Sequence, residues 1–134
     1  MALNPHLSDT SANASAVAIG TLANSGKLAI YQGTQPANAN GDASGSTLLA
    51  TLTLAASAFG APNAGVITAA AITSAQAVAG GTAQWFRVFE SDGITALFDG
   101  SVGLTSGNNI NMAATTIVQG AYVSVSALTF TVTE

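Results

Sequence analysis

The side chains that could do chemistry are few and widely spread along the chain. The 134 residues include six Asp or Glu, two Lys or Arg, one His and no Cys. His6 is the only histidine, so a Ser-His-Asp triad would require the N-terminal segment to fold into a site. Acid–base catalysis and metal binding both need several titratable groups to converge. We therefore expect a protein that is not an enzyme, with no catalytic residue, cofactor or metal.

One group of carboxylates could suggest a cation site. Glu90, Asp92 and Asp99 lie close together in the sequence, and carboxylate oxygens are ligands for calcium. Their spacing does not match a regular calcium loop. Asp92-Gly93 is instead a typical hairpin sequence, so we interpret these acids as turn residues.

Arg87 lies in an apolar run beside Trp85 and Phe89. An arginine in such a run either stacks on an aromatic ring and pairs with an acid, such as Asp99 or Glu90, or faces a partner. We favour the intramolecular pair.

The remaining candidates for chemistry are weaker. Lys27 could in principle form an isopeptide cross-link, but only the presence of Asn and Asp supports that idea. The glycine-rich pieces 41–45 and 80–81 do not lead from a strand into a helix with a lysine behind it, so we expect no phosphate site. With a net charge of −4 and two basic side chains, direct nucleic-acid binding is not expected.

The composition points to partners of another kind. Only 6% of residues are charged, against about a quarter in ordinary soluble domains, and Ala, Gly, Ser and Thr fill more than half of the chain. A monomer with so few charges would lack the hydrated surface that keeps proteins apart, so we expect a homo-oligomer or a larger assembly. The N-terminus has no typical secretory signal, and no apolar run reaches the length of a membrane helix.

We expect a helix or arm over residues 1–25, followed by one β-domain over 26–134. Residues 8–24 have helical propensity, with Ser8 as N-cap and Asn24-Ser25-Gly26 as the stop. The bulkier apolar side chains Val17, Ile19, Leu22 and Ala23 could form its packing face. The alternative is a flexible leader that orders on assembly.

After Gly26 the pattern changes to that of strands. Trp85, Arg87 and Phe89 share one face of the run 83–91 and Phe86 shares the other with Val88, which predicts a central strand covered on both sides. The long loop 33–46 contains almost nothing to bury, so it is either a mobile surface loop or an arm that reaches a partner. The expected strands are 27–32, 47–54 with Leu48, Ala50, Leu52 and Leu54 on one face, 65–73 anchored by Val66 and Ile72, 83–91, 94–100, 109–113 and 121–132.

About seven strands, separated by turns and preceded by one helix, predict a mainly β fold: an antiparallel β-sandwich of immunoglobulin-like or jelly-roll type. No repeat at a solenoid or propeller period is present.

Three segments resemble a family of small virion-associated structural proteins of tailed bacteriophages and prophages. They are Lys27-Leu28-Ala29-Ile30-Tyr31-Gln32-Gly33-Thr34-Gln35-Pro36-Ala37, then Leu48-Leu49-Ala50-Thr51-Leu52 before Phe59-Gly60, and Trp85-Phe86-Arg87 before Asp99-Gly100-Ser101-Val102-Gly103. The resemblance covers roughly Gly26 to the C-terminus. It implies a non-catalytic part of a phage particle present in many copies, and it supplies no functional residues.

Within a virion, we expect a capsid decoration or cement protein that binds the outer capsid surface. The outer surface is expected because an anionic chain would be repelled by packaged DNA. The partners would be the major capsid protein and copies of this chain. The N-terminal segment and the loop 33–46 are the candidates for contacts between subunits. The alternatives are a tail, baseplate or fibre component, and a carbohydrate-binding module in which Trp85, Tyr31 or Tyr122 stacks on a sugar.

Overall fold

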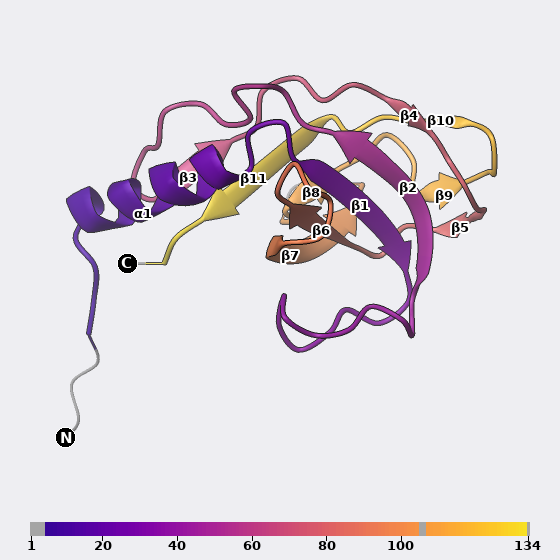
Figure 1. Ribbon diagram of the computed structural model, residues 1–134, viewed down its shortest axis with the longest axis horizontal. Coiled ribbons are helices and arrows are strands. Elements are labelled where there is room, and N and C mark those ends of the chain that lie inside the picture. The colour runs from indigo at the N-terminus through magenta and orange to yellow at the C-terminus, as the bar shows by residue number, and fades with distance from the viewer. Residues whose placement is uncertain (1–4, 105–106, 134) are drawn as a thin grey trace.

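A computed structural model describes residues 5–104 and 107–133, in which one helix is followed by short strands (Figure 1). The chain is mainly β, as the sequence predicted. The elements are α1 (Asp9–Leu22), β1 (Lys27–Gln32), β2 (Thr47–Thr53), β3 (Val66–Thr68), β4 (Ala75–Gln76), β5 (Gly81–Thr82), β6 (Trp85–Phe89), β7 (Ala96–Gly103), β8 (Ile110–Asn111), β9 (Thr116–Ile117), β10 (Tyr122–Val123) and β11 (Ala127–Thr131).

Seven strands form the main sheet, in the order β2-β1-β6-β7-β8-β11-β3. Two small sheets, β10-β4 and β5-β9, lie together at the end of the molecule opposite the helix (Figure 1). The pairs are antiparallel except β7 with β8, which run parallel. This arrangement agrees with the predicted β-sandwich-like architecture with one N-terminal helix.

The helix begins and ends where the sequence indicates. The Ser8 hydroxyl accepts a hydrogen bond from the Ser11 backbone N–H, and the chain leaves α1 through Ser25, whose φ is 56°. None of the described helical residues forms a segment long and apolar enough to cross a membrane.

The predicted packing face of the helix was wrong in part. Val17 and Leu22 are both 50% exposed, while the small residues Ala12, Ala16 and Gly20 are buried. A Cβ on Gly20 would lie 3.3 Å from the Phe59 Cβ, so the helix approaches the sheet more closely than larger side chains would allow. The small residues therefore make the contact, and the larger ones face outward.

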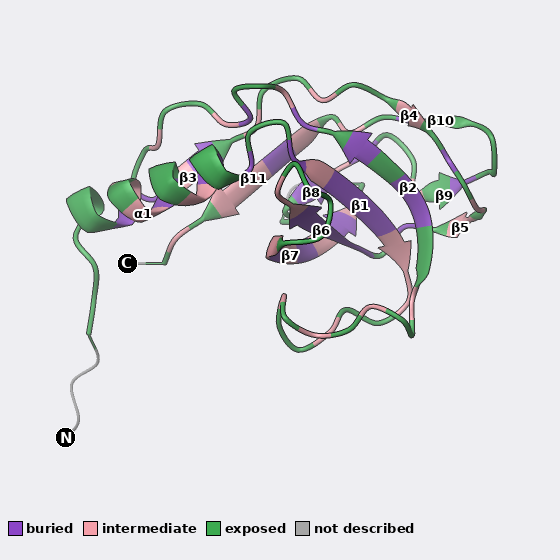
Figure 2. Ribbon diagram, in the orientation of Figure 1, coloured by how far each residue is buried: buried purple, intermediate pink, exposed green. Residues whose placement is uncertain are grey.

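The predicted central strand is confirmed by β6, which lies between β1 and β7 in the main sheet. Four of its five residues are buried, as the purple band in Figure 2 shows. The Asp92-Gly93 hairpin is also confirmed, because the Glu90 N–H donates to the Thr95 carbonyl at 2.9 Å and Gly93 has a φ of 70°.

The predicted core face of residues 47–54 needs one correction. Ala50, Leu52 and Leu54 are buried as expected, but Leu48 is 38% exposed and Leu49 is fully buried. The register explains this result, because Ile30 pairs with Ala50 and the next residue, Tyr31, pairs with Leu48. The chain bulges at Leu49, which adds one residue and reverses the alternation on one side of the bulge.

Two predicted strands are shorter than their sequence pattern. The run 65–73 forms β3 only over its first part, and Ile67 rather than Val66 is its buried anchor, at 1% exposure. The run 121–132 divides into β10, which pairs with β4, and β11, which pairs with β8 and β3. Because the two halves pair with different strands, alternation along one segment could not predict the break.

Candidate functional site

Arg87 and Asp99 form a buried ion pair at the centre of the main sheet. They lie opposite each other in the β6–β7 register, with Arg87 Nη2 at 2.9 Å from Asp99 Oδ2. The two side chains are 6% and 8% exposed. This pair confirms the intramolecular pairing predicted for Arg87.

The same guanidinium holds the long loop 33–46 against the sheet. Arg87 Nη1 donates to the Gly41 carbonyl at 2.7 Å, and Nη2 donates to the Asn38 carbonyl at 3.3 Å. The Gln35 amide donates to Asp99 Oδ1 at 2.9 Å. The loop is therefore docked on its own domain, and its inner side covers the outer face of β6.

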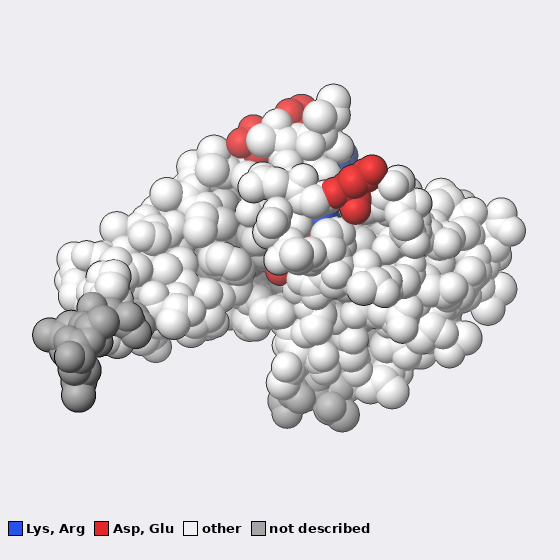
Figure 3. Space-filling view, turned by 90° about the horizontal axis from the view of Figure 1, so that it is seen from below, with Lys and Arg blue, Asp and Glu red and all other residues white. Residues whose placement is uncertain are grey.

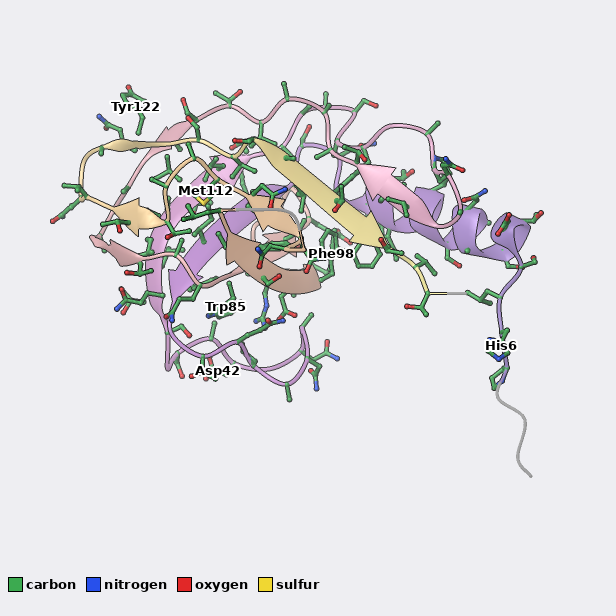
Figure 4. All side chains as sticks on the ribbon, turned by 180° about the vertical axis from the view of Figure 1, so that it is seen from behind. His6, Asp42, Trp85, Phe98, Met112 and Tyr122 are labelled. Carbon is green, nitrogen blue, oxygen red and sulfur yellow. The ribbon has the colours of Figure 1, made fainter. Side chains whose placement is uncertain are left out.

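Trp85 completes the contact between the loop and the sheet. Its ring stacks on Tyr31 with centroids 4.4 Å apart, and Arg87 Cζ lies 5.3 Å from its centroid. Its indole N–H donates to the Ser46 hydroxyl at 3.2 Å, and Figure 4 shows it between the strands and the loop that carries Asp42. Burial raises the pKa of Tyr31, with the Arg87 charge acting in the opposite direction. Since Trp85 is 1% exposed, its ring faces are not available to a sugar.

Two other acids stabilise turns. The Asp92 carboxylate accepts hydrogen bonds from the Ile94 and Thr95 N–H groups and from the Thr95 hydroxyl, and these bonds lower its pKa, that from Ile94 most. The pKa of Asp42 is lowered in the same way by the hydroxyl and N–H of Ser44. Asp92 is thus a turn residue, as interpreted from the sequence. The same interpretation was wrong for Asp99, which lies within β7 and pairs with Arg87.

The remaining candidates from the sequence lie apart from this ion pair. His6 is exposed on the segment before α1, away from the sheet (Figure 4). The Lys27 ammonium donates to the Thr53 hydroxyl at 3.1 Å. Within residues 5–104 and 107–133, no three His, Cys, Asp or Glu side chains are grouped in a way that could hold a metal ion.

The surface is largely uncharged, and it exposes large apolar side chains. Figure 3 shows the acidic side chains gathered over one part of the molecule, whereas the end formed by β4, β5, β9 and β10 is free of charge in that view. The exposed large apolar residues are Leu7, Val17, Leu22, Leu48, Val78, Ile94, Leu104, Val118 and Tyr122.

Two hollows lie beside these exposed residues. One, of about 340 Å³, lies between α1 and the segment 57–62 and is lined by Val17, Gly20 and Phe59 among others. The other, of about 230 Å³, lies at the opposite end and is lined by Met112, Val118 and Tyr122 among others. Of the described residues that line the two hollows, only Tyr122 has an ionisable side chain, so both hollows offer mainly apolar and uncharged contacts.

Sequence reasoning found the ion pair but missed what it holds. The contacts to Asn38 and Gly41 use backbone carbonyls, which leave no signature in side-chain identity. One signal was available in the sequence. The predicted central strand needs cover over Trp85 and Arg87, and the long loop 33–46, which has almost nothing of its own to bury, was a segment that could provide it. The exposed apolar end was also missed, because its strands are two residues long and carry almost no periodicity.

Comparison with protein-family models, curated proteins and solved structures gives no significant match for this chain.

Proposed function

We propose that this chain is a non-catalytic structural protein of a bacteriophage particle, a decoration protein that binds the outer capsid surface and stabilises the lattice of major capsid subunits. The observation that supports this proposal best is the surface, which combines few charges with exposed apolar side chains. Arg87, one of only two cations, is used inside the fold, and the rest of the chain offers little for binding charged ligands. Such a surface suits repeated protein contacts, each of modest strength, summed by symmetry.

The sign of the charge favours the outer surface over the interior. With a net charge of −4, the protein would be repelled by packaged DNA. Since Arg87 is buried and paired, Lys27 is the remaining cation. A position on the outside of the shell avoids that repulsion.

The helix side is the surface we assign to the capsid. Val17 and Leu22 are half-exposed on α1, Leu7 is 42% exposed just before it, and the larger hollow lies alongside. Residues 5–8 extend beyond the helix, away from the sheet (Figure 1). The loop 33–46 is a weaker candidate for reaching a capsid subunit, because its inner side is occupied by Arg87 and Asp99.

The two alternative functions would depend on other features of the protein. A tail, baseplate or fibre component would use the same kind of surface at another position in the phage particle. A carbohydrate-binding module would need an exposed ring, and Tyr122, 72% exposed, is the aromatic residue that meets this need. The hollow that Tyr122 lines is formed mainly by alanine and larger apolar side chains, which offer the hydroxyl groups of a sugar few hydrogen-bond partners, so this alternative has less support than protein contact.

The test is binding to particles from which this protein has been removed. We expect purified protein to bind such capsids saturably and to raise their resistance to heat, with density on the outer lattice in symmetry-averaged images. Val17→Asp combined with Leu22→Asp should weaken binding at least tenfold, because charges would be buried in an apolar contact.

Ile94→Asp is the matched control, since Ile94 is 81% exposed in the β6–β7 hairpin, outside the helix surface. It should bind as the wild type does, and circular dichroism should show that all variants are folded. Density for this chain at the tail alone would refute the capsid assignment, and so would binding that is unchanged by the two helix substitutions.

A further inference from the structure

The end of the molecule opposite the helix, here called the tip, comprises residues 75–82 and 116–123. Backbone hydrogen bonds join its two segments: the Ala77 N–H donates to the Ala121 carbonyl at 2.8 Å, and the Gly120 N–H donates to the Ala77 carbonyl at 2.9 Å. A turn from Val118 to Ala121 is closed by a bond of 3.0 Å. These bonds bring Val78, Val118 and Tyr122 into one small area.

The tip exposes three apolar side chains. Val78 is 60% exposed, Val118 65% and Tyr122 72%. Tyr122 pairs with Gln76, and Val78 lies two residues beyond that pair, in the bend that follows β4. Figure 4 shows Tyr122 at the outer limit of the molecule, pointing away from it, and Met112 inside. Val118 and Tyr122 line the same hollow, and the backbone bonds between the two segments keep Val78 close to them, so exposed apolar groups gather at the tip. Exposed apolar patches on soluble proteins often mark interaction surfaces.

Charge indicates what covers this patch. The sequence holds no Asp, Glu, Lys or Arg between Asp42 and Arg87 or between Asp99 and Glu134, and both segments of the tip lie in these stretches. A strongly charged partner would therefore find no complementary group there. Two copies of this chain, each with a net charge of −4, repel one another least when they meet through the part that carries no acid.

The shape of the tip also suits a copy of itself. The Tyr122 side chain, 72% exposed, points away from the molecule and lines a hollow of about 230 Å³ together with Ile117, Val118 and Val123 among others. A patch that carries both a protrusion and a hollow can pair with its own copy about a two-fold axis, in which each copy fills the other's hollow. An exposed tyrosine is typical of the residues that dominate such contacts.

We infer that the tip is the surface through which two copies of this chain associate. The inference deepens the proposed function, since it assigns the contact between copies to the tip and leaves the helix side for the capsid. The two contacts lie at opposite ends, so one molecule can make both at once and link neighbouring sites on a lattice.

The experiment is sedimentation equilibrium of the isolated full-length protein from low micromolar to millimolar concentration, with no particle present. The wild type should form dimers in a concentration-dependent way. Tyr122→Ala should weaken the association about tenfold or more, as expected for a central interface aromatic. Val118→Asp should weaken it further, because it would place two carboxylates in one apolar contact.

Ile94→Asp and Val17→Asp are the matched controls, since both change exposed apolar residues outside the tip. Both should dimerise as the wild type does, and thermal melts should show that every variant is folded. A wild type that stays monomeric at millimolar concentration would overturn the inference, as would tip variants that dimerise normally. Loss of particle binding in tip variants of a monomeric protein would assign the tip to the capsid instead.

This result is separate from the test of the proposed function. Capsid binding is measured with dilute protein and depends on the helix substitutions, whereas dimerisation is measured without capsids. If one assay gives a negative result, the other can therefore still be interpreted.

Discussion

At the scale of single residues, Arg87 connects several parts of the fold. It contacts Asp99, the carbonyls of Asn38 and Gly41, and the Trp85 ring, so one side chain joins two strands and the long loop. Its Nε is buried without a hydrogen-bond partner, so burial of the charge is compensated only in part. A buried pair of this kind holds a loop in place more surely than it adds net stability.

Removing one member of the pair should therefore cost more than removing both. Arg87→Met should lower the free energy of unfolding by about 3–5 kcal/mol, because Asp99 would remain buried without its counter-ion. The double variant Arg87→Met with Asp99→Leu should recover most of that loss. Urea titrations followed by circular dichroism measure both, and Trp85 fluorescence reports whether the loop stays docked.

Lys27→Met is the control for loss of a cation, and it should change the free energy of unfolding by less than about 1 kcal/mol, since it removes one hydrogen bond to Thr53. A double variant as unstable as Arg87→Met would contradict the argument, because it would show that the bonds to the loop, and not the stranded charge, carry the loss.

At the scale of elements, the bulge in β2 decides which leucine belongs to the core. Leu48 and Leu49 are chemically identical neighbours, yet the first is 38% exposed and the second is fully buried. At the bulge, the Leu49 carbonyl accepts a hydrogen bond of 2.8 Å from the Val78 N–H, in the segment that follows β4. The bulge thus links the main sheet to the tip.

The two leucines provide a matched pair of substitutions. Leu49→Ala should lower the free energy of unfolding by about 2–5 kcal/mol, the usual cost of an unfilled cavity in a core. Leu48→Ala should change it by about 0.5 kcal/mol or less, as for other surface positions. Equal losses in urea titrations of the two variants would show that the register of β1 and β2 differs from the one described.

At the scale of the whole molecule, the distribution of charge separates two kinds of surface. Acidic side chains gather over one part of the face seen in Figure 3, whereas the two segments of the tip contain no acid. Copies that meet at the tip still repel over longer distances, because each carries the same net charge. Association should therefore depend on salt in the direction set by repulsion.

Added sodium chloride should strengthen the dimer. Raising the ionic strength from about 0.01 M to 0.15 M shortens the screening length from roughly 30 Å to 8 Å and weakens the repulsion between the two copies. Sedimentation equilibrium at the two ionic strengths gives the dissociation constants directly. A dimer that weakens with salt would indicate contacts made of ion pairs, which the tip as described does not contain.

The sequence by itself determined the features that depend on local pattern. The N-cap at Ser8, the central strand around Trp85 and the Asp92-Gly93 hairpin were predictable, because capping, alternation and turn preference act over a few residues. An acidic partner for Arg87 was predictable as well, since an arginine in a buried strand needs an acid nearby, but the choice of Asp99 over Glu90 came from the structure.

Only the tertiary structure decided the rest. Whether Val17 or Ala16 faces the sheet depends on how closely α1 approaches Phe59 and Ile67. The spacing of apolar residues along the helix does not predict that distance. The docking of the loop 33–46 uses backbone carbonyls, and the tip is assembled from residues about 40 positions apart by bonds between backbone groups. Backbone groups are the same in every residue, so their partners are set by the fold and not by the amino-acid pattern.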